Sequence, residues 1–453
     1  MPIPTSNKDA FEAIYGYSAI KQELREIADF FKNPYAYKRF NARMLSGLLI
    51  NGEPGLGKTL MANCLIQESG LTCFTFRKDT DSKTALKAIK KTFQQAAENA
   101  PAIVFFDDID KLSNNDYRLS DTDEFVTIQS CIDEYKERGV FIIATSNNSD
   151  KLPRSLKRAG RFDRVLTINA PVGKDAYDIV SSYLSKKQCA MNFELSEVVS
   201  IVEGRSCAFL EAVINEASLI AGYNKAAAIS LEHFVHAYTR MMNNERLATF
   251  ADSHLPKDMQ QALNSERARV AYHEAGHIVV GEVLIPSCTN IAFLSGAEDN
   301  LSGLTKQTIA QETDAYARRR YDICISLGGM CATEHIYGVP EVGAQKDLQQ
   351  AAGTMKELLA YSALNGMYHT TGEKYETTSH LSYDHERAAA VLLEQYRWDV
   401  RQIIASHNKE LDAIAHMLYR KGYILAKDID AIMRPASAHQ NNKPQNKCFD
   451  KAS

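Results

Sequence analysis

Hydrophobic and polar positions divide the chain into three blocks of different periodicity. In the first block, short apolar runs alternate with amphipathic stretches. The runs typical of buried strands are residues 45–51, 72–76, 103–107, 140–145 and 165–168. Strands that alternate with helices predict a parallel sheet covered on both faces. From residue 171 to about 242 the periodicity is helical, and a polar connector at 243–256 precedes a third, mainly helical block.

This pattern predicts three folded parts and a tail. We expect an α/β domain at residues 1–170, a small helical domain with its linker at 171–256, and a mainly α-helical domain at 257–434. The tail at 435–453 is rich in Asn, Lys, Gln and Ser, which predicts disorder.

The composition, net charge and cysteine count indicate a globular protein of a reducing compartment. Of the 453 residues, 45% are hydrophobic and 24% charged, which is typical of globular domains, and the net charge of -4 argues against nucleic-acid binding. Nine cysteines without paired spacing favour free thiols and a reducing compartment, so we expect a cytoplasmic protein. The polar first ten residues and the lack of a long apolar run predict no direct membrane insertion.

The third block contains the motif His-Glu-Ala-Gly-His at residues 273–277. Residues four apart on a helix lie one above the other, so His273 and His277 can bind one zinc ion while Glu274 reaches its bound water. A carboxylate in that place can act as the general base of amide hydrolysis. The alternative is a helix with two surface histidines, but the flanking residues are apolar on both sides, which predicts a buried helix. Gly276 inside that helix predicts close packing.

The first block contains a phosphate-binding loop. Residues 52–59, Gly-Glu-Pro-Gly-Leu-Gly-Lys-Thr, follow an apolar strand, as the P-loop mechanism requires. Backbone amides of this loop would surround the phosphates of ATP, Lys58 would reach the terminal phosphates, and Thr59 would hold Mg²⁺. The residues that we assign to nucleotide binding in this loop are Gly52, Pro54, Gly55, Gly57, Lys58 and Thr59.

Polar residues that follow two later strands belong to the same predicted site. Asp107 and Asp108 end the apolar run that begins at Ile103, where one acid can bind Mg²⁺ and its neighbour can polarise the attacking water. Asn147 follows the strand at 140–145, in place to contact the same water or the γ-phosphate. The alternative for the two acids is an ordinary solvated strand end.

Taken in this order, the P-loop, the two acids, Asn147, the run at 158–164 and the zinc motif resemble the FtsH family of AAA+ ATP-dependent zinc metalloproteases. The resemblance covers residues 9–433 and implies a ring, usually a hexamer. It also implies that Arg158 and Arg161 act as arginine fingers on the nucleotide of the neighbouring subunit. Without that resemblance, the two arginines would be interpreted as a basic surface loop.

The same resemblance suggests a third zinc ligand. Residues 327–338 are similar to the family's double-glycine helix, and residues 343–348 to the segment whose aspartate completes the zinc site, which implies that role for Asp347. Glu334 and His335 can also bind zinc and lie nearby in sequence. Glu334 is therefore an alternative ligand, or a residue that orients an imidazole.

The chain departs from the family pattern at several places. It has no membrane-spanning helices, and the charged sequence at residues 77–83 lacks the aromatic pore loop that grips polypeptide in related motors. Asp108 stands where the family has glutamate, which predicts slow hydrolysis. Cys207 replaces a glycine and Thr333 replaces an acid, and we expect the fold to tolerate both.

Residues 289–294 predict a strand beside the zinc site, and a peptide substrate could pair with its edge. The alternative is an ordinary structural strand.

The leading hypothesis is an ATP-dependent zinc endopeptidase that forms a ring and degrades proteins, with Zn²⁺, ATP and Mg²⁺ as cofactors. A second hypothesis keeps the peptidase but makes ATP regulatory, without processive unfolding. A third is a nucleotide-switched, chaperone-like binding protein whose zinc site stabilises the fold.

Overall fold

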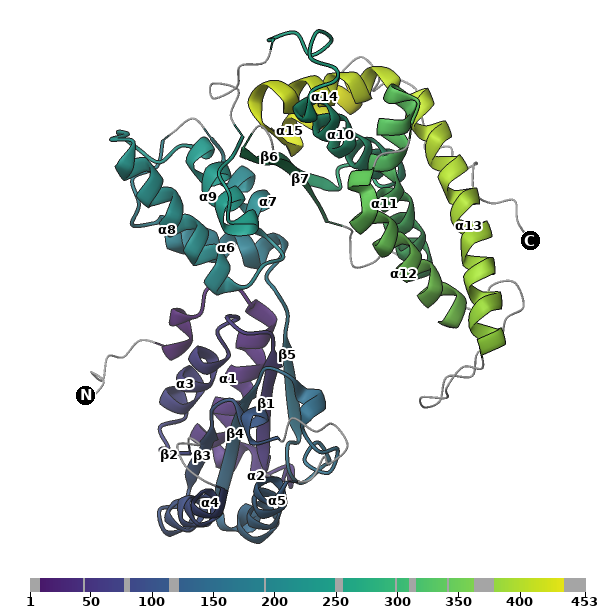
Figure 1. Cartoon of the computed structure of the whole chain (residues 1–453). Helices are drawn as coiled ribbons and strands as arrows, with labels where there is room; N and C mark the ends of the chain where they lie inside the picture. The colour runs from purple at the N-terminus through teal and green to yellow at the C-terminus, as the bar shows by residue number, and fades with distance from the viewer. Residues whose placement is uncertain are drawn as a thin grey trace. The chain divides into compact units, whose positions relative to one another are not determined.

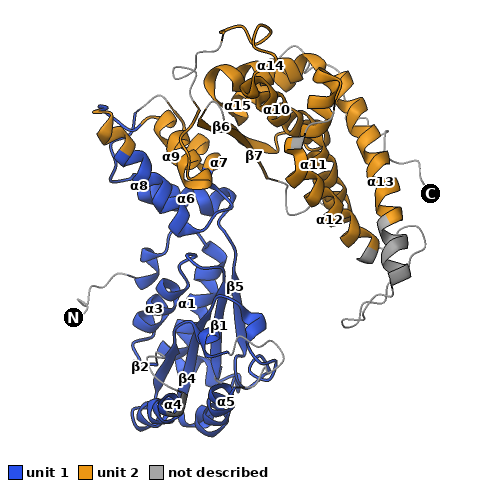
Figure 2. Cartoon of the chain, viewed as in Figure 1, with its two compact units in different colours: residues 1–190, 202–219, 226–229 blue, residues 191–201, 220–225, 230–453 orange. Residues whose placement is uncertain are grey.

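The computed structural model describes ten stretches of the chain, which form two compact units (Figures 1 and 2). The described residues are 9–43, 45–76, 82–113, 122–190, 193–248, 256–297, 300–308, 315–339, 342–361 and 379–435. Unit 1 comprises residues 1–190, 202–219 and 226–229, and unit 2 comprises 191–201, 220–225 and 230–453. In the described part, no helix is both long and apolar enough to cross a membrane. The predicted domain boundaries stay predictions, and the tail beyond residue 435 lies outside the described residues.

Unit 1 contains a five-stranded parallel sheet in the order β2-β3-β4-β1-β5 (Figure 1). Its strands are β1 (Gly47–Gly52), β2 (Thr72–Phe76), β3 (Ala102–Phe106), β4 (Val140–Ser146) and β5 (Arg164–Ile168). All five predicted strands and their parallel arrangement are confirmed. Every residue of β3 and β4 is buried, which explains why these strands appear in the sequence as continuous apolar runs.

Helices cover both faces of this sheet. On one face, Phe93 of α4 (Ser82–Glu98) and Ile128 of α5 (Asp123–Tyr135) pack with Val104 and Ile142 of the sheet. Helix α3 (Lys58–Ser69) contacts β1 and β4. The helices of this region are η1 (Ala10–Ala13), α1 (Ser18–Lys32), α2 (Pro34–Lys38), α3 (Lys58–Ser69), α4 (Ser82–Glu98), η2 (Ile109–Leu112), α5 (Asp123–Tyr135), η3 (Lys136–Arg138) and η4 (Ser149–Lys151). Helix α3 begins directly after the glycine-rich loop, where Gly55 and Gly57 have left-handed φ angles of 80° and 84°.

The region after β5 is helical, as the periodicity predicts. Its helices are α6 (Gly173–Leu184), α7 (Leu195–Val202), α8 (Cys207–Tyr223) and α9 (Leu231–Asn243). The start of α8 contacts the P-loop, because the Ala208 amide donates to the Gly55 carbonyl at 3.0 Å. Cys207 Sγ lies 3.9 Å from the Leu56 carbonyl oxygen and 3.6 Å from the Tyr17 hydroxyl, so the thiol fills space between the loop and the N-terminal segment.

Unit 2 is built around the helix that carries the 273–277 motif. Its elements after α9 are α10 (Glu266–Leu284), β6 (Thr289–Ala297), β7 (Asn300–Gln307), α11 (Ala315–Tyr337), η6 (Val342–Ala344), α12 (Gln345–Tyr361), α13 (Ser379–Ser406), α14 (Asn408–Lys421), β8 (Tyr423–Leu425) and α15 (Ala426–Met433). Side chains of α10, α11, α13 and α14 share one hydrophobic core with β6. Helix α10 therefore runs through the centre of the unit.

The strand predicted at 289–294 exists as β6, but it is not an edge strand. The antiparallel sheet has the order β7-β6-β8, so β6 pairs on both sides. The expectation that a peptide pairs with the edge of this strand is therefore wrong. In the described part of the sheet, β7 is the edge strand on the side of the catalytic motif.

Helices α10 and α11 approach each other through glycines. A Cβ atom built on Gly276 would come closer than 3.0 Å to the Gly328 carbonyl oxygen, and one on Gly328 would lie 2.7 Å from the Gly276 carbonyl oxygen. A Cβ on Gly329 would lie 2.6 Å from His273 Nε2 and 2.7 Å from His277 Nε2. Gly276 and Gly328 thus let the two backbones touch, as the sequence predicts for Gly276, and Gly329 leaves room for the imidazole rings.

Candidate functional site

The two histidines of the motif lie one turn apart on α10, with their ring nitrogens facing each other. Their Nε2 atoms are 3.1 Å apart, and Asp347 Oδ2 lies 3.0 Å from His273 Nε2 and 3.4 Å from His277 Nε2. Asp347 stands in the first turn of α12, 74 residues along the chain from His273. Two imidazole nitrogens and a carboxylate oxygen within 4.8 Å of one another match the donors that a catalytic zinc ion prefers.

Hydrogen bonding and charge prepare this cluster for a cation. His277 Nδ1 donates to the Ile325 carbonyl oxygen at 2.7 Å, which leaves the Nε2 lone pair of the neutral ring directed at the cluster. Burial lowers the pKa of His277, but the contact with Asp347 and the charge of Glu274 outweigh it and raise the pKa to about 9. Burial raises the pKa of Asp347, yet its hydrogen bonds with both histidines hold that pKa well below its usual range. The two imidazole nitrogens and the carboxylate oxygen are therefore stabilised when a proton or a metal ion is bound between them.

Glu274 lies between α10 and the edge strand β7. It is 5% exposed, and its Oε2 accepts a hydrogen bond of 2.6 Å from Thr305 Oγ1. A Cβ on Gly303 would come closer than 3.0 Å to this carboxylate, so Gly303 provides the space that the side chain occupies. The sequence contained no signal that assigns Thr305 or Gly303 to the site, because their strand was not predicted.

The other acid considered as a metal ligand is engaged elsewhere. Glu334 accepts hydrogen bonds from Arg397 at 3.0 Å and Arg401 at 2.8 Å, both on α13. His335 Nε2 lies 3.0 Å from Asn408 Oδ1. Neither residue is in the cluster, and Glu334 does not orient either imidazole. Thr333, which replaces a family acid, is buried and donates to the carbonyls of its own helix.

A cleft of about 900 Å³ opens beside the cluster. One wall is β7, where Gly303, Thr305 and Gln307 alternate along the strand and contact α10. Gln307 Nε2 donates to the His277 carbonyl oxygen at 2.9 Å, which anchors the end of this wall. The lining also includes Asp322, Ile325 and Ser326 of α11, and Gly343, Gln345, Lys346, Asp347 and Gln350. The cleft can therefore receive an extended chain that adds to the edge of β7 and passes the cluster.

In unit 1, the predicted nucleotide-binding side chains meet at the carboxyl end of the sheet. Lys58 Nζ donates to Asn147 Oδ1 at 2.8 Å, and Thr59 Oγ1 donates to Asp107 Oδ1 at 2.9 Å. Asn147 Nδ2 in turn donates to Asp108 Oδ1 at 3.1 Å. Burial lowers the pKa of Lys58, and the neighbouring aspartates oppose that shift. Five side chains from three separated motifs thus form one connected polar site.

Two further residues, Thr145 and Asp110, belong to this site and were not predicted from the sequence. Thr145 Oγ1 donates a hydrogen bond to Asp107 Oδ1 at 2.8 Å and accepts one from the backbone N–H of Asp108. Asp110 Oδ1 accepts a hydrogen bond of 3.1 Å from the backbone N–H of Asn147. Thr145 could have been found, because it ends the predicted strand at 140–145 on the same edge as Asp107. Asp108 also forms an ion pair of 2.7 Å with Lys111.

The two candidate arginine fingers differ from each other. Arg161 donates to Gln129 and to the Ser155 carbonyl oxygen, and it forms an ion pair of 2.8 Å with Asp133. Arg158 is exposed, and its guanidinium has no hydrogen bond or ion pair with the described residues. In the described part of the chain, neither side chain is bonded to the nucleotide-binding residues.

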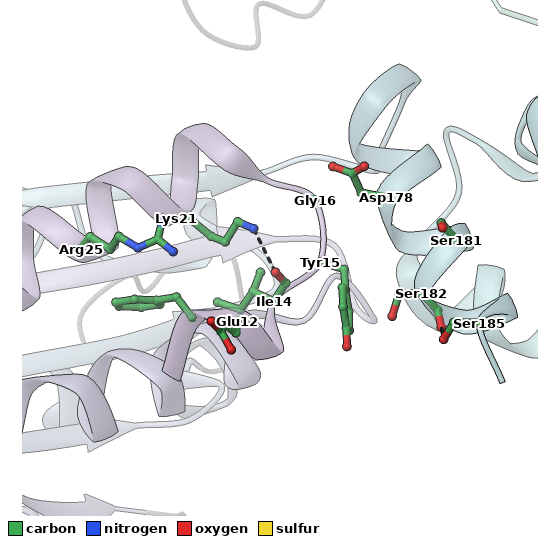
Figure 3. Close-up of a pocket in the computed structure, with 11 residues that line it drawn as sticks. Glu12, Ile14, Tyr15, Gly16, Lys21, Arg25, Asp178, Ser181, Ser182 and Ser185 are labelled. Carbon is green, nitrogen blue, oxygen red and sulfur yellow. Dashed lines mark hydrogen bonds between the residues drawn. The ribbon is translucent and has the colours of Figure 1, made fainter. Parts of the chain in front are cut away.

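A second cavity, of about 480 Å³, lies in unit 1 between the N-terminal segment and α6 (Figure 3). Lys21 donates to the Ile14 carbonyl oxygen at 3.1 Å, and Arg25 is bound to Asp9, so both cations of this cavity stabilise the segment that forms its wall. The neighbouring Tyr17 donates to the Asn169 carbonyl oxygen and contacts Cys207 beside the P-loop.

Two family models match the chain. Residues 48–170 match the ATPase family associated with various cellular activities (AAA), and residues 260–432 match peptidase family M41. The first range contains the P-loop and its acids, and the second contains the metal-site cluster, in the order that the sequence predicts.

Several relatives are similar over nearly the whole chain. The ATP-dependent zinc metalloproteases FtsH of Methylococcus capsulatus and Mycoplasma genitalium are 29% and 30% identical over 96% of this chain. The FtsH protein of Ureaplasma parvum is 28% identical over 93% of it. The chain belongs to the FtsH family. It spans 60% of the length of the Ureaplasma protein, 63% of the Mycoplasma protein and 71% of the Methylococcus protein.

Within this FtsH-family chain, unit 1 supplies the α/β AAA module and unit 2 the helical M41 peptidase module. The fold class predicted from the sequence is therefore confirmed. The eight cysteines in the described residues are all free thiols, as expected. The segment that would hold a pore loop, residues 77–81, lies outside the described residues.

Proposed function

We propose that this chain is an ATP-dependent zinc endopeptidase that degrades proteins or peptides. The observation that carries the proposal is the convergence of His273, His277 and Asp347 beside the buried Glu274, in a cleft with an edge strand for a wall. The P-loop site of the same chain and the names of its relatives support the dependence on ATP.

The peptidase chemistry follows from the positions of four side chains. His273, His277 and Asp347 would hold Zn²⁺, which when bound lowers the pKa of a water molecule and polarises the peptide carbonyl. Glu274 is the general base: Thr305 occupies Oε2, which leaves Oε1 to take a proton from the attacking water and pass it to the leaving amine. The edge of β7 holds the substrate backbone through hydrogen bonds.

The nucleotide site would hold ATP and Mg²⁺. The backbone amides of the P-loop would bind the phosphates, and the metal ion would offset part of their negative charge. Lys58 would exchange its bond with Asn147 for one with the terminal phosphates, and Thr59 and Asp107 would bind the metal ion. Asp108, held by Asn147 and Lys111, would polarise the attacking water. The roles of Gly52, Pro54, Gly55 and Gly57 are to shape the loop that surrounds the phosphates.

We further propose a homo-oligomeric ring, a hexamer, in the cytoplasm, with protein substrates and no nucleic acid among its partners. Arg158 supports a ring, because its guanidinium is exposed and has no ion pair with the described residues, so it is free to contact a nucleotide bound to a neighbouring subunit. Arg161 would have to leave Asp133 to do the same.

The dependence on ATP is tested by Lys58→Ala, which removes the phosphate contact of the P-loop. We expect this variant to lose ATP hydrolysis by about a hundredfold or more and to lose the degradation of casein. The measurement is casein cleavage with and without ATP, for the unmodified protein and the variant. Cleavage that survives in Lys58→Ala would favour the ATP-regulated peptidase, and no cleavage by the unmodified protein would favour the chaperone-like alternative.

Removal of the third ligand tests the metal site. We expect Asp347→Ala to lower the zinc content of the purified protein from about one ion per chain to nearly none, because two histidines alone bind zinc weakly. Glu334→Gln is the control, since its carboxylate binds two arginines instead. The measurement is metal analysis after gel filtration. Loss of zinc in the Glu334 variant with retention in the Asp347 variant would reverse the assignment.

A further inference from the structure

Two acidic side chains of the peptidase cleft belong to neither the metal cluster nor the general base: Glu266, which is exposed, and Asp322, which is half-buried. Asp322 lines the cleft together with Ile325 and Ser326, which follow it by about one turn on the same face of α11. The Ile325 carbonyl holds the His277 ring, so Asp322 lies about one helical turn from a contact of the metal cluster. A substrate chain that reaches the cluster along β7 must therefore pass close to this carboxylate.

No side chain of the described residues forms an ion pair with Asp322, although Arg318 and Arg319 lie one turn before it on α11. Its carboxylate is half-buried, and it makes no hydrogen bond or ion pair with the described residues. Burial raises its pKa, while Arg318 and Arg319 on the preceding turn oppose that shift from a distance. Arg319 is bound to Glu357 on α12 at 3.0 Å, so it is not available to Asp322. A half-buried carboxylate without a partner gains free energy when a cation binds it.

The other charged groups of the cleft do not supply that cation. Besides the cluster and Glu274, the lining contains Glu266, Asp322 and Lys346. Lys346 and Glu266 are exposed, and Lys346 precedes Asp347 at the start of α12, with no ion pair to Asp322. The cleft wall on α11 is therefore negative, and the partner that fits it is a positively charged side chain of the substrate.

We propose that Asp322 is a specificity-determining residue that selects lysine or arginine in the peptide held by the cleft. The selection rests on the proposed peptidase function. An extended peptide that pairs with β7 directs alternate side chains toward α11, and a long basic side chain can place its charge against the Asp322 carboxylate. Aliphatic side chains bind there without that ion pair, and acidic side chains are repelled.

The test compares the binding of three fluorescently labelled decapeptides that are identical except for one central residue, Lys, Leu or Glu. The protein is the full-length chain loaded with zinc and carrying Glu274→Gln, so that bound peptide is not cut. Fluorescence anisotropy gives the three Kd values. We expect the Lys peptide to bind about tenfold more tightly than the Leu peptide, and the Glu peptide to bind weakest.

Two substitutions in the same background locate the effect. Asp322→Asn should reduce the preference for Lys over Leu to less than about twofold, and Asp322→Lys should make the Glu peptide the tightest of the three. Asp399→Asn is the matched control: this aspartate on α13 is also half-buried with its pKa raised by burial, but it does not line the cleft, so the preference should persist.

The outcomes separate the two proposals. If all three peptides bind equally to the protein with Asp322 intact, or if the preference survives in Asp322→Asn, the assignment of Asp322 is wrong while the peptidase function stands. If none of the peptides binds, the cleft is not a peptide site and both proposals fall. The three peptides are first compared on the protein that retains Asp322. That comparison therefore tests the proposal even if the Asp322 variants fold poorly.

Discussion

Glu274→Gln should reduce the proteolytic rate by about 10² to 10⁴-fold while the protein keeps its zinc. Glu274 is the buried carboxylate beside the cluster, and its Oε1 is the atom left to accept a proton. Glutamine has nearly the same shape and can accept the hydrogen bond from Thr305, but it cannot act as a base. The measurement is the initial rate of casein or peptide cleavage at saturating ATP, together with zinc content.

The control for this variant is Glu266→Gln, which removes an exposed acid of the same helix and the same cleft. Its cleavage rate should stay within about twofold of the unmodified protein, because surface charges in a high dielectric contribute little. ATP hydrolysis should be unchanged in both variants, since Glu274 lies outside the nucleotide site. A Glu274→Gln protein that still cleaves at an undiminished rate would exclude this carboxylate as the general base.

Gly276→Ala should destabilise unit 2 by about 3 kcal/mol, although alanine favours helices. The added methyl group would come closer than 3.0 Å to the Gly328 carbonyl oxygen and would lie 2.6 Å from the Ala332 Cβ. Backbone atoms cannot move aside as a flexible side chain does, so α10 and α11 would have to separate. Urea unfolding followed by the fluorescence of Trp398 measures the effect, because this residue is the only tryptophan and lies on α13 of unit 2.

The matched control is Gly353→Ala on α12, where a Cβ atom would have no neighbour within 4 Å. There the same substitution should stabilise the protein by about 0.5 to 1 kcal/mol, because it restricts the unfolded chain. Opposite signs at the two glycines would establish that helix contact, and not helix propensity, decides the effect at Gly276. If both variants are stabilised, the close approach of α10 and α11 is wrong.

Local sequence patterns were sufficient for most of the fold and for both functional motifs. The five strands of the parallel sheet were predictable, because buried parallel strands are continuous apolar runs bounded by polar turns. The P-loop and the motif at 273–277 were predictable as well, since each places its functional groups within eight residues or fewer. Asp107 and Asn147 followed from the rule that parallel strands end at one edge.

Local patterns could not decide which residues from distant parts of the chain act together. Glu334 and Asp347 are both acids downstream of the histidines, and spacing alone left both open. The fold separates them, because α12 brings Asp347 to the imidazoles while α13 supplies two arginines to Glu334. The edge strand was misassigned for a related reason: pairing partners are remote in sequence, and β8 covers the side of β6 that a local pattern leaves open.

The sequence by itself determined the two chemistries and the order of their modules, because a P-loop and a zinc-binding helix turn are local arrangements of backbone and side chains. Tertiary structure alone decided which acid completes the cluster, which strand borders the cleft, and which half-buried carboxylate of the cleft has no hydrogen bond or ion pair with the described residues. The physical reason is that metal ligation, strand pairing and charge compensation depend on distances through space between segments that the chain order does not relate.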